Sequence, residues 1–161
     1  MEKNKIKKVL IAIDYDPSSE KIALQGLQFA KAMGAQAILI HVIADSNYYS
    51  SLEYSPVFGY LGFNDSDLAH LQDKEGLKNA TTNFLNKLKH HLGDDSVETV
   101  VKEGEFGESI LKAAKNLDAD VIVMGSHSRN WIDSVLLGSV TKNVLSSATI
   151  PLFIIPIKEH K

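Results

Sequence analysis

The chain of 161 residues contains no cysteine. This absence excludes disulfide bonds, thiolate catalysis and cysteine-ligated zinc sites, and it fits a reducing compartment. A surplus of positive charge is missing too, because 17 lysines and arginines stand against 20 aspartates and glutamates, a formal net charge of −3. Binding to nucleic acid needs a basic face that displaces counterions, so we expect no nucleic-acid partner.

Long hydrophobic runs are also missing. No segment approaches the roughly 20 apolar residues that span a bilayer, and the apolar run at residues 9–13 is too short for a signal-peptide core. We therefore expect no membrane partner and a cytoplasmic location. Apolar residues still make up 44% of the chain and charged residues 23%, which is typical of a globular protein. The length predicts one domain over residues 1–161.

Five short apolar segments, the predicted strands, alternate with longer segments of helical period. Four of them are almost continuously apolar, as expected when helices cover both faces of a parallel sheet. The exception contains Glu98 and Thr99 and is typical of a sheet edge. The predicted strands are residues 9–13, 37–43, 97–101, 121–124 and 152–157.

Helical periodicity predicts four helices between these strands. The first begins at Asp16 and Pro17, an N-cap and first-turn pair, and ends at Gly34. The others cover residues 77–92, residues 106–117 and a segment from Ser139 onward. Strands and helices thus alternate, and right-handed crossovers make this an α/β fold, a doubly wound three-layer sandwich.

The segment from Asp45 to Ser66 is longer than the connections usual in such folds. It has no clear period and holds half of the aromatic residues of the chain. These are Tyr48, Tyr49, Tyr54, Phe58, Tyr60 and Phe63. The segment leaves the carboxyl end of the second predicted strand, at the rim where such sheets bind ligands. Two interpretations stay open, a surface loop packed on itself and a lid or docking surface.

Two common phosphate-binding signatures are absent. Neither G-x-x-x-x-G-K-[ST] nor G-x-G-x-x-G follows a strand, which argues against Walker-type NTPases and ordinary dinucleotide dehydrogenases. Another glycine-bounded loop runs from Gly125, at the end of the fourth strand, to Gly138 and Ser139 at the start of the last helix. Free amides, the helix dipole and the hydroxyls of Ser139 and Thr141 would suit a phosphate chain. A purely structural role for these glycines stays open.

The same stretch resembles the G-x2-G-x9-G-[ST] signature of the universal stress protein family, with Gly125 first and Gly138-Ser139 as the closing pair. The similarity extends to an aspartate after the first strand, a His-Val pair in the second, a glycine after the third and the ending ATIPLFIIPI. These features are Asp14, His41 with Val42, Gly104 and residues 148–157. The resemblance covers the chain except for the aromatic segment 45–66.

The resemblance implies a Rossmann-like sandwich with a five-stranded parallel sheet in the order 3-2-1-4-5. It also implies a homodimeric stress-response protein that binds ATP, with Mg2+ as the accompanying ion. Asp14 and Gly125 would then face each other across the crevice between the first and fourth strands. For Asp14, a capping carboxylate before the first helix is the alternative.

The family pattern also assigns individual residues of this chain to the nucleotide. Ala12, Asp14 and Val42 would surround adenine and ribose. Met124, Gly125, Ser128, Gly138, Ser139, Val140 and Thr141 would line the ribose and phosphates. Arg129 and His127 are within reach of the phosphates in principle, although exposed loop residues of these types are more often only solvated.

Ser128 departs from the signature, because it occupies the position of the second glycine. Its side chain would obstruct the close approach of loop and phosphate or replace it with a hydroxyl contact. We therefore expect weakened but not abolished ATP binding. Since some branches of the family lack the motif, the alternative is a dimeric interaction module that binds no nucleotide.

Metal and catalytic centres find little support in the sequence. His90 and His91 are adjacent on a helix and point about 100° apart, which is a poor chelate geometry. His41 lies in an apolar run and is expected to be a hydrogen-bonded core residue. No nucleophile, base and orienting group can be assembled, so slow ATP hydrolysis or autophosphorylation is the most that we expect.

A phosphorylated receiver domain is a further alternative of a different class. Asp14 and Asp16 resemble its acidic pair, but that fold also needs an aspartate at the end of the third strand. The sequence Val-Val-Lys-Glu at residues 100–103 supplies none, and Lys158 alone is weak support for the lysine of the fifth strand. A similar strand layout is poor evidence of function.

The last predicted strand favours a homodimer. The family order places this apolar strand at a sheet edge, where it invites aggregation unless it is covered. Prolines fit an edge because they donate no ladder hydrogen bond. The expected dimer residues are Pro151, Leu152, Phe153, Ile154, Ile155 and Pro156.

Overall fold

The computed structural model describes residues 5–14, 18–44, 74–126 and 137–157. Its elements, in chain order, are β1 (Lys8–Ala12), α1 (Ser19–Met33), β2 (Gln36–Ile43), α5 (Lys74–His91), β3 (Glu98–Glu103), α6 (Phe106–Asn116), β4 (Val121–Gly125), α7 (Ser139–Ser147) and β5 (Leu152–Ile155). The strands form one parallel sheet in the order β3-β2-β1-β4-β5. The predicted strand order and the edge position of β3 are therefore confirmed.

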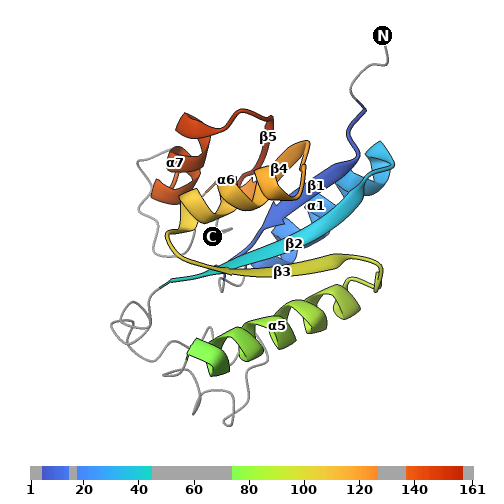
Figure 1. Cartoon of the computed structure of the whole chain (residues 1–161). Coiled ribbons are helices and arrows are strands. Elements are labelled where there is room, and N and C mark those ends of the chain that lie inside the picture. The colour runs from blue at the N-terminus through green and yellow to red at the C-terminus, as the bar shows by residue number, and fades with distance from the viewer. Residues whose placement is uncertain (1–4, 15–17, 45–73, 127–136, 158–161) are drawn as a thin grey trace.

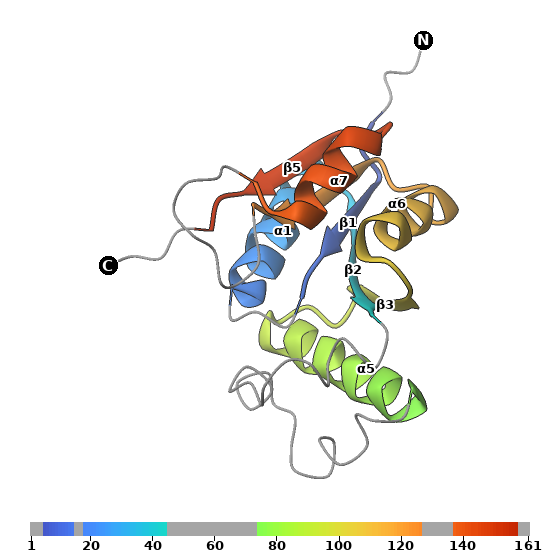
Figure 2. The same ribbon diagram turned by 90° about the vertical axis from the view of Figure 1, so that its left-hand side faces the viewer.

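Helices cover both faces of the sheet, as Figures 1 and 2 show. Residues of α1 and α5 pack into one hydrophobic cluster with one face of the strands, and residues of α6 and α7 pack into a second cluster with the other face. In β1, Val9 and Ile11 belong to the first cluster, whereas Leu10 and Ala12 belong to the second. Because alternate strand residues face opposite layers, a continuous apolar run is what this three-layer arrangement requires.

The start of α1 differs from the expected one. The helix begins at Ser19 with Ser18 at the N-cap position, rather than at Asp16 and Pro17, which lie outside the described residues. Both Ser18 and Asp16 are residue types that N-caps favour, so the sequence signal did not distinguish them. The predicted end is confirmed, because Gly34 adopts the left-handed conformation (φ 65°) that suits glycine at a helix end.

The end of β5 also differs from the expected one. The strand stops at Ile155 instead of Ile157. Pro156 has no amide hydrogen for the ladder, and the amide of Ile157 donates to the hydroxyl of Ser126 (2.9 Å) rather than to a strand. The chain thus leaves the sheet at Pro156.

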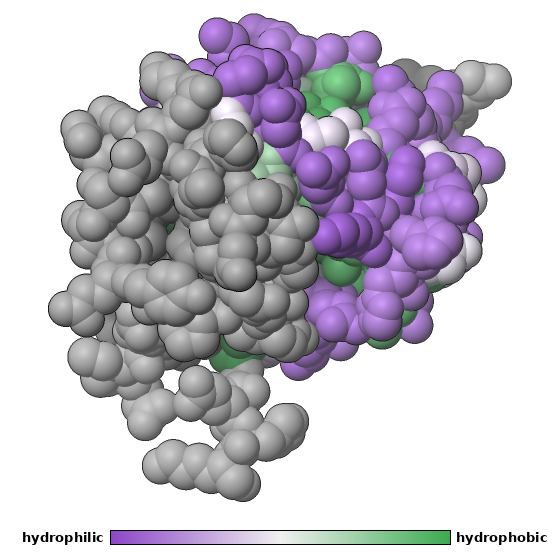
Figure 3. Space-filling view, turned by 90° about the horizontal axis from the view of Figure 1, so that it is seen from below, coloured by the Kyte–Doolittle hydropathy of each residue, from purple (hydrophilic) through white to green (hydrophobic). Residues whose placement is uncertain are grey.

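The second predicted helix is confirmed as α5, and its apolar stripe is buried. The buried stripe residues are Leu77, Thr81, Phe84, Leu85 and Leu88. Its last turn is linked to α1 by His91 and Glu20 (2.8 Å), while Asp94 beyond the helix pairs with Lys31 (3.5 Å). On the side of α5 the described surface is mainly hydrophilic, and hydrophobic residues, coloured green, are visible only in small areas (Figure 3).

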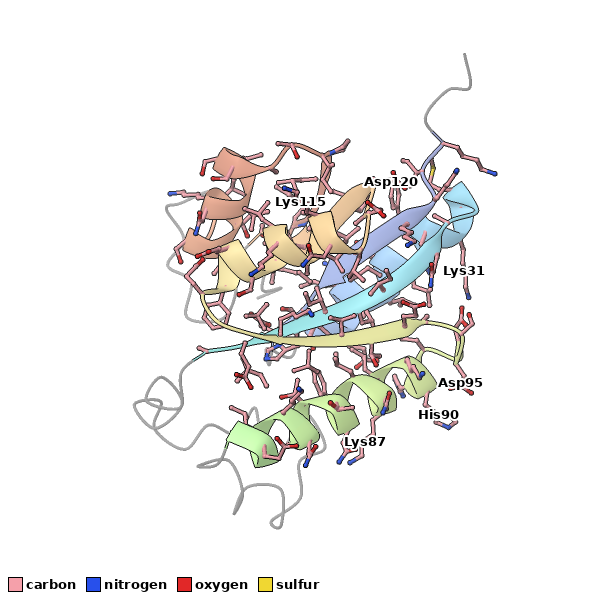
Figure 4. All side chains as sticks on the ribbon, in the orientation of Figure 1. Lys31, Lys87, His90, Asp95, Lys115 and Asp120 are labelled. Atoms are coloured by element: carbon pink, nitrogen blue, oxygen red, sulfur yellow. The ribbon has the colours of Figure 1, made fainter. Side chains whose placement is uncertain are left out.

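Charged side chains gather where the strands begin, at the end of the sheet opposite the start of α7. Lys31, Asp95 and Asp120 lie there (Figure 4). The carboxylate of Asp120 accepts from the amides of Lys7 (2.8 Å) and Lys8 (3.0 Å), which fixes the entry into β1. The aromatic segment 45–66 lies outside the described residues. Among the helices that the structure describes, none has both the length and the apolar character needed to cross a bilayer.

Candidate functional site

The carboxyl ends of the five strands define the candidate site. The strand order places β2 and β3 on one side of β1, and β4 and β5 on the other. The chain first adds strands on one side of β1 and then adds β4 and β5 on the other side. The topological switch point of the sheet is therefore between β1 and β4, which pair through Ile11 and Val123 near their ends. Asp14 follows β1 and Gly125 ends β4, so both lie at the carboxyl edge of the sheet beside this switch point, the place where ligands bind in open α/β sheets.

Four of the predicted site residues share the face of the sheet that α6 and α7 cover. Ala12, Val42 and Met124 are buried members of that cluster, and Val140 at the start of α7 is partly buried against it. They come from three neighbouring strands and the following helix. Apolar side chains of this kind suit contact with a flat aromatic ring more than with a charged group.

The turn that carries Asp14 is fixed by β2. The amide of Ile13 donates to the carbonyl of Ile40 (3.0 Å), and Nδ1 of His41 donates to the carbonyl of Ile13 (2.9 Å), because a carbonyl can only accept. Asp14 itself is half-buried. Its backbone is therefore anchored one residue earlier. Ser18 occupies the N-cap position of α1 without a side-chain cap hydrogen bond, so the capping alternative for Asp14 stays open.

Burial gives His41 an unusual protonation equilibrium. Loss of solvent lowers the pKa of the imidazole from 6.5 to about 4, and the hydrogen bond to Ile13 opposes this only in part. The residue is 3% exposed, and its ring is neutral at pH 7. The sequence prediction of a hydrogen-bonded core histidine is confirmed.

The start of α7 presents backbone amides before the first intrahelical hydrogen bond. That bond runs from Lys142 N to Gly138 O (2.9 Å). The amides of Ser139, Val140 and Thr141 precede it, and the N-cap glycine has no side chain that could accept from them. Such amides, together with the positive end of the helix dipole, form a surface suited to an anion.

Two other hydrogen-bond donors at the start of α7 already have acceptors within the protein. The amide of Gly138 donates to Ser126 O (2.7 Å), and the hydroxyl of Thr141, a buried side chain, donates to Gly125 O (2.9 Å). These bonds hold α7 against the end of β4. The three amides of the first turn, rather than the Gly138 amide or the Thr141 proton, are thus the donors that have no acceptor within the helix.

Gly125 has a packing reason for lacking a side chain. A Cβ at this position would lie 2.7 Å from Cδ1 of Ile22 in α1 and 3.2 Å from Cγ1 of Ile157. The space is filled by these two side chains. The structural interpretation of this glycine, left open by the sequence, therefore has direct support.

Several candidates cannot be located. Ser128, Arg129, His127 and the neighbouring Trp131 lie outside the described residues. Conversely, sequence reasoning missed Ser126, whose amide, carbonyl and hydroxyl all form hydrogen bonds that join three segments. Its place beside the first signature glycine was the signal that could have found it. Within the described ranges, no group of three or more histidines and carboxylates is arranged to hold a metal ion.

Comparisons with known proteins extend over nearly the whole chain. The model of the universal stress protein family matches residues 5–156. A universal stress protein of Methanocaldococcus jannaschii is 31% identical over 156 residues, which cover 94% of this chain and 96% of that protein. Universal stress protein A of Escherichia coli is 28% identical over 155 residues, covering 96% and 97% of the two chains.

A solved structure is similar over the same length. The structure of the M. jannaschii protein matches with a TM-score of 0.69 at 26% sequence identity, covering 97% of this chain and 99% of that chain. The similarity therefore includes the strand order and the arrangement of helices on both faces of the sheet.

Proposed function

The chain belongs to the universal stress protein family, and from this we propose that it is a cytoplasmic ATP-binding sensor or adaptor of the stress response. In this proposal it acts as a homodimer and not as a turnover enzyme. One observation carries the nucleotide part. The amides of Ser139, Val140 and Thr141 precede the first intrahelical bond of α7, beside the switch point between β1 and β4.

The residues at this edge fit the parts of ATP. The three amides of α7 and its dipole would hold the polyphosphate, which supplies the negative charge that they need. Asp14, anchored through Ile13 and His41, would accept from the ribose hydroxyls. The apolar layer around Ala12, Val42 and Met124 would contact adenine. Mg2+ would accompany the phosphates.

Two solved proteins of similar fold support an adenine nucleotide as the ligand class. One universal stress protein was solved in complex with cAMP and another, from Archaeoglobus fulgidus, in complex with dAMP. Both match with a TM-score of 0.57, at 20% and 16% identity. Their likeness to this chain is one of fold, so the choice of ATP among adenine nucleotides rests on the family signature, and the amides at the start of α7 support an anionic ligand.

The dimer part of the proposal rests on β5. It is the edge strand next to β4, it is apolar, and prolines flank it on both sides. Phe153 is 39% exposed and stacks on Phe29 of α1, with ring centroids 4.7 Å apart. A second copy paired along β5 would cover this edge and the exposed ring.

A second candidate function is a dimeric interaction module without nucleotide. It is favoured because residues that the family pattern assigns to the nucleotide contact other parts of the protein instead. The hydroxyl of Thr141 is bonded to Gly125 O, and the space beside Gly125 is filled by Ile22 and Ile157. Ser128 in place of the second signature glycine points in the same direction.

Two measurements distinguish the candidates: whether the purified protein carries a bound adenine nucleotide, and whether Ser128→Gly binds ATP more tightly than the wild type. Acid denaturation of a nucleotide-binding protein should release a compound with the absorbance and retention time of an adenine nucleotide. Titration with ATP and Mg2+ should then give measurable binding, tightened in Ser128→Gly because the glycine permits a closer approach of the loop. An empty protein that does not bind millimolar ATP would support the interaction module.

A further inference from the structure

Ser126 lies where three segments of the chain meet, directly after β4. Its amide donates to Ile155 O at the end of β5 (2.9 Å), and its carbonyl accepts from Gly138 N at the start of α7 (2.7 Å). Its hydroxyl oxygen accepts from Ile157 N (2.9 Å). The residue is buried. One residue therefore holds both the helix start that presents the proposed phosphate amides and the end of the last strand.

The hydroxyl has a role that the backbone of Ser126 cannot fill. Pro156 cannot donate a hydrogen bond, so the pairing of β5 ends at this residue. The next amide, that of Ile157, is part-buried and has Ser126 Oγ as its acceptor. Buried amides require an acceptor. The hydroxyl thus fixes the course of the chain after β5.

Gly125 strengthens the same junction. Its carbonyl accepts from Thr141 Oγ1 in the first turn of α7 (2.9 Å). The side chain of Ile157, together with that of Ile22, fills the space in which a Cβ would lie. The start of α7 and the end of β5 are therefore both attached to residues 125 and 126, and neither can move without the other adjusting.

We propose that Ser126 is a positioning residue that couples the nucleotide site at the start of α7 to β5, so that ATP binding strengthens the pairing of β5 with a second copy of the chain. This inference rests on the proposed function. A phosphate chain that orders the first-turn amides also orders Gly138 and, through Ser126, the segment from Ile155 to Ile157. Coupling between two binding events is reciprocal, so dimerisation strengthens ATP binding by the same factor.

The test compares three variants with the wild type. Ser126→Ala removes the acceptor of Ile157 N, and Ser126→Thr keeps it. Ser146→Ala is the matched control, because it removes another serine hydroxyl, which donates to Asn143 O (2.9 Å) at the exposed end of α7. For each protein, calorimetry measures ATP binding with Mg2+, and sedimentation measures the dimer dissociation constant with and without saturating ATP. Amide exchange at Ile157 is followed by NMR.

The coupling should depend on the hydroxyl of Ser126. In the wild type, Ser126→Thr and Ser146→Ala, ATP should lower the dimer dissociation constant about 5-fold or more, the lower end of ordinary allosteric coupling. It should also slow exchange at Ile157. In Ser126→Ala the dimer dissociation constant should become independent of ATP, while ATP still binds. If Ser126 has only a structural role, Ser126→Ala would instead weaken the dimer equally with and without ATP. The ratio of the two dimer dissociation constants would then be the same as in the wild type, and this result would overturn the inference.

The remaining outcomes separate this inference from the proposed function. If the wild type binds ATP but its dimer constant and Ile157 exchange do not respond, the coupling is wrong and the nucleotide function stands. A wild type that stays monomeric with and without ATP also overturns the coupling and removes the dimer from the proposed function. If ATP does not bind at all, the nucleotide function is wrong, and the coupling is wrong with it.

Discussion

At the scale of single residues, burial and one hydrogen bond decide the chemistry of His41. The sequence predicted a core histidine because His41 interrupts an apolar run, and the structure places the ring where burial lowers its pKa to about 4. The acceptor, Ile13 O, could not be predicted. Ile13 directly follows β1, 28 residues earlier in the chain, and only the parallel register of β1 and β2 brings the two groups together.

The low pKa of His41 predicts acid sensitivity. Between pH 6.5 and 4 the unfolded chain binds a proton at His41 that the folded chain does not bind, so the free energy of unfolding falls as the pH falls. At about 1.4 kcal/mol per pKa unit, the difference between 6.5 and about 4 corresponds to about 3 kcal/mol once this range has been crossed. Urea unfolding between pH 7 and pH 4 measures it.

His41→Asn is the control for this prediction. The asparagine amide keeps a donor near the position of Nδ1 and does not titrate. Its unfolding free energy should therefore lack this part of the pH dependence. An equally steep dependence in His41→Asn would assign the acid sensitivity to other groups.

At the scale of elements, local signals predicted where helices lie better than how they are joined. Glycine followed by serine predicted the start of α7 at Ser139, and that is where it begins. The bonds that attach α7 to β4, from Thr141 to Gly125 and from Gly138 to Ser126, were not predictable. They join residues 12 or more positions apart, and no local propensity encodes such contacts. The N-cap of α6 is a similar case, because glutamate is not among the residue types that N-caps favour.

Glu105 is predicted to stabilise α6 as its N-cap. Its carboxylate accepts from the amides of Gly107 (3.1 Å) and Glu108 (2.7 Å). Glu105→Ala should lower the free energy of unfolding by about 1 kcal/mol, the usual cost of a lost cap, as measured by urea unfolding. Glu108→Ala, an exposed change in the same first turn, should cost clearly less. Equal losses for the two variants would contradict a capping role.

At the scale of the whole molecule, the fold was predictable because each element carries its own period. Both sheet edges also had a signal, since Glu98 and Thr99 interrupt β3 and prolines flank β5. The strand order followed from the resemblance to a family. The site residues of the signature stay a prediction from the resemblance, whereas the packing reason for Gly125 required the positions of Ile22 and Ile157.

Phe153→Glu is predicted to separate the proposed dimer. The ring is partly exposed beside Phe29, so a glutamate is compatible with the folded monomer but places a charge in the paired edge. Light scattering should report a dimer for the wild type and a monomer for the variant. Leu24→Glu, at a similarly exposed leucine of α1, should remain dimeric. A folded wild type that scatters as a monomer would refute the interface.

The most direct test of the central claim is a calorimetric titration of ATP and Mg2+ into Ser139→Pro, Ser139→Ala and the wild type. Ser139 is the first residue of α7, where proline is tolerated, and Gly138 has the extended backbone (φ −68°, ψ 163°) that precedes a proline without strain. Proline removes one phosphate-facing amide and alanine removes only the hydroxyl. We expect ATP to bind the wild type, to bind Ser139→Pro about 10-fold or more weakly, as for one lost charge-assisted hydrogen bond, and to lose much less affinity in Ser139→Ala. Equal affinity in all three proteins, or no binding to the wild type, would contradict it.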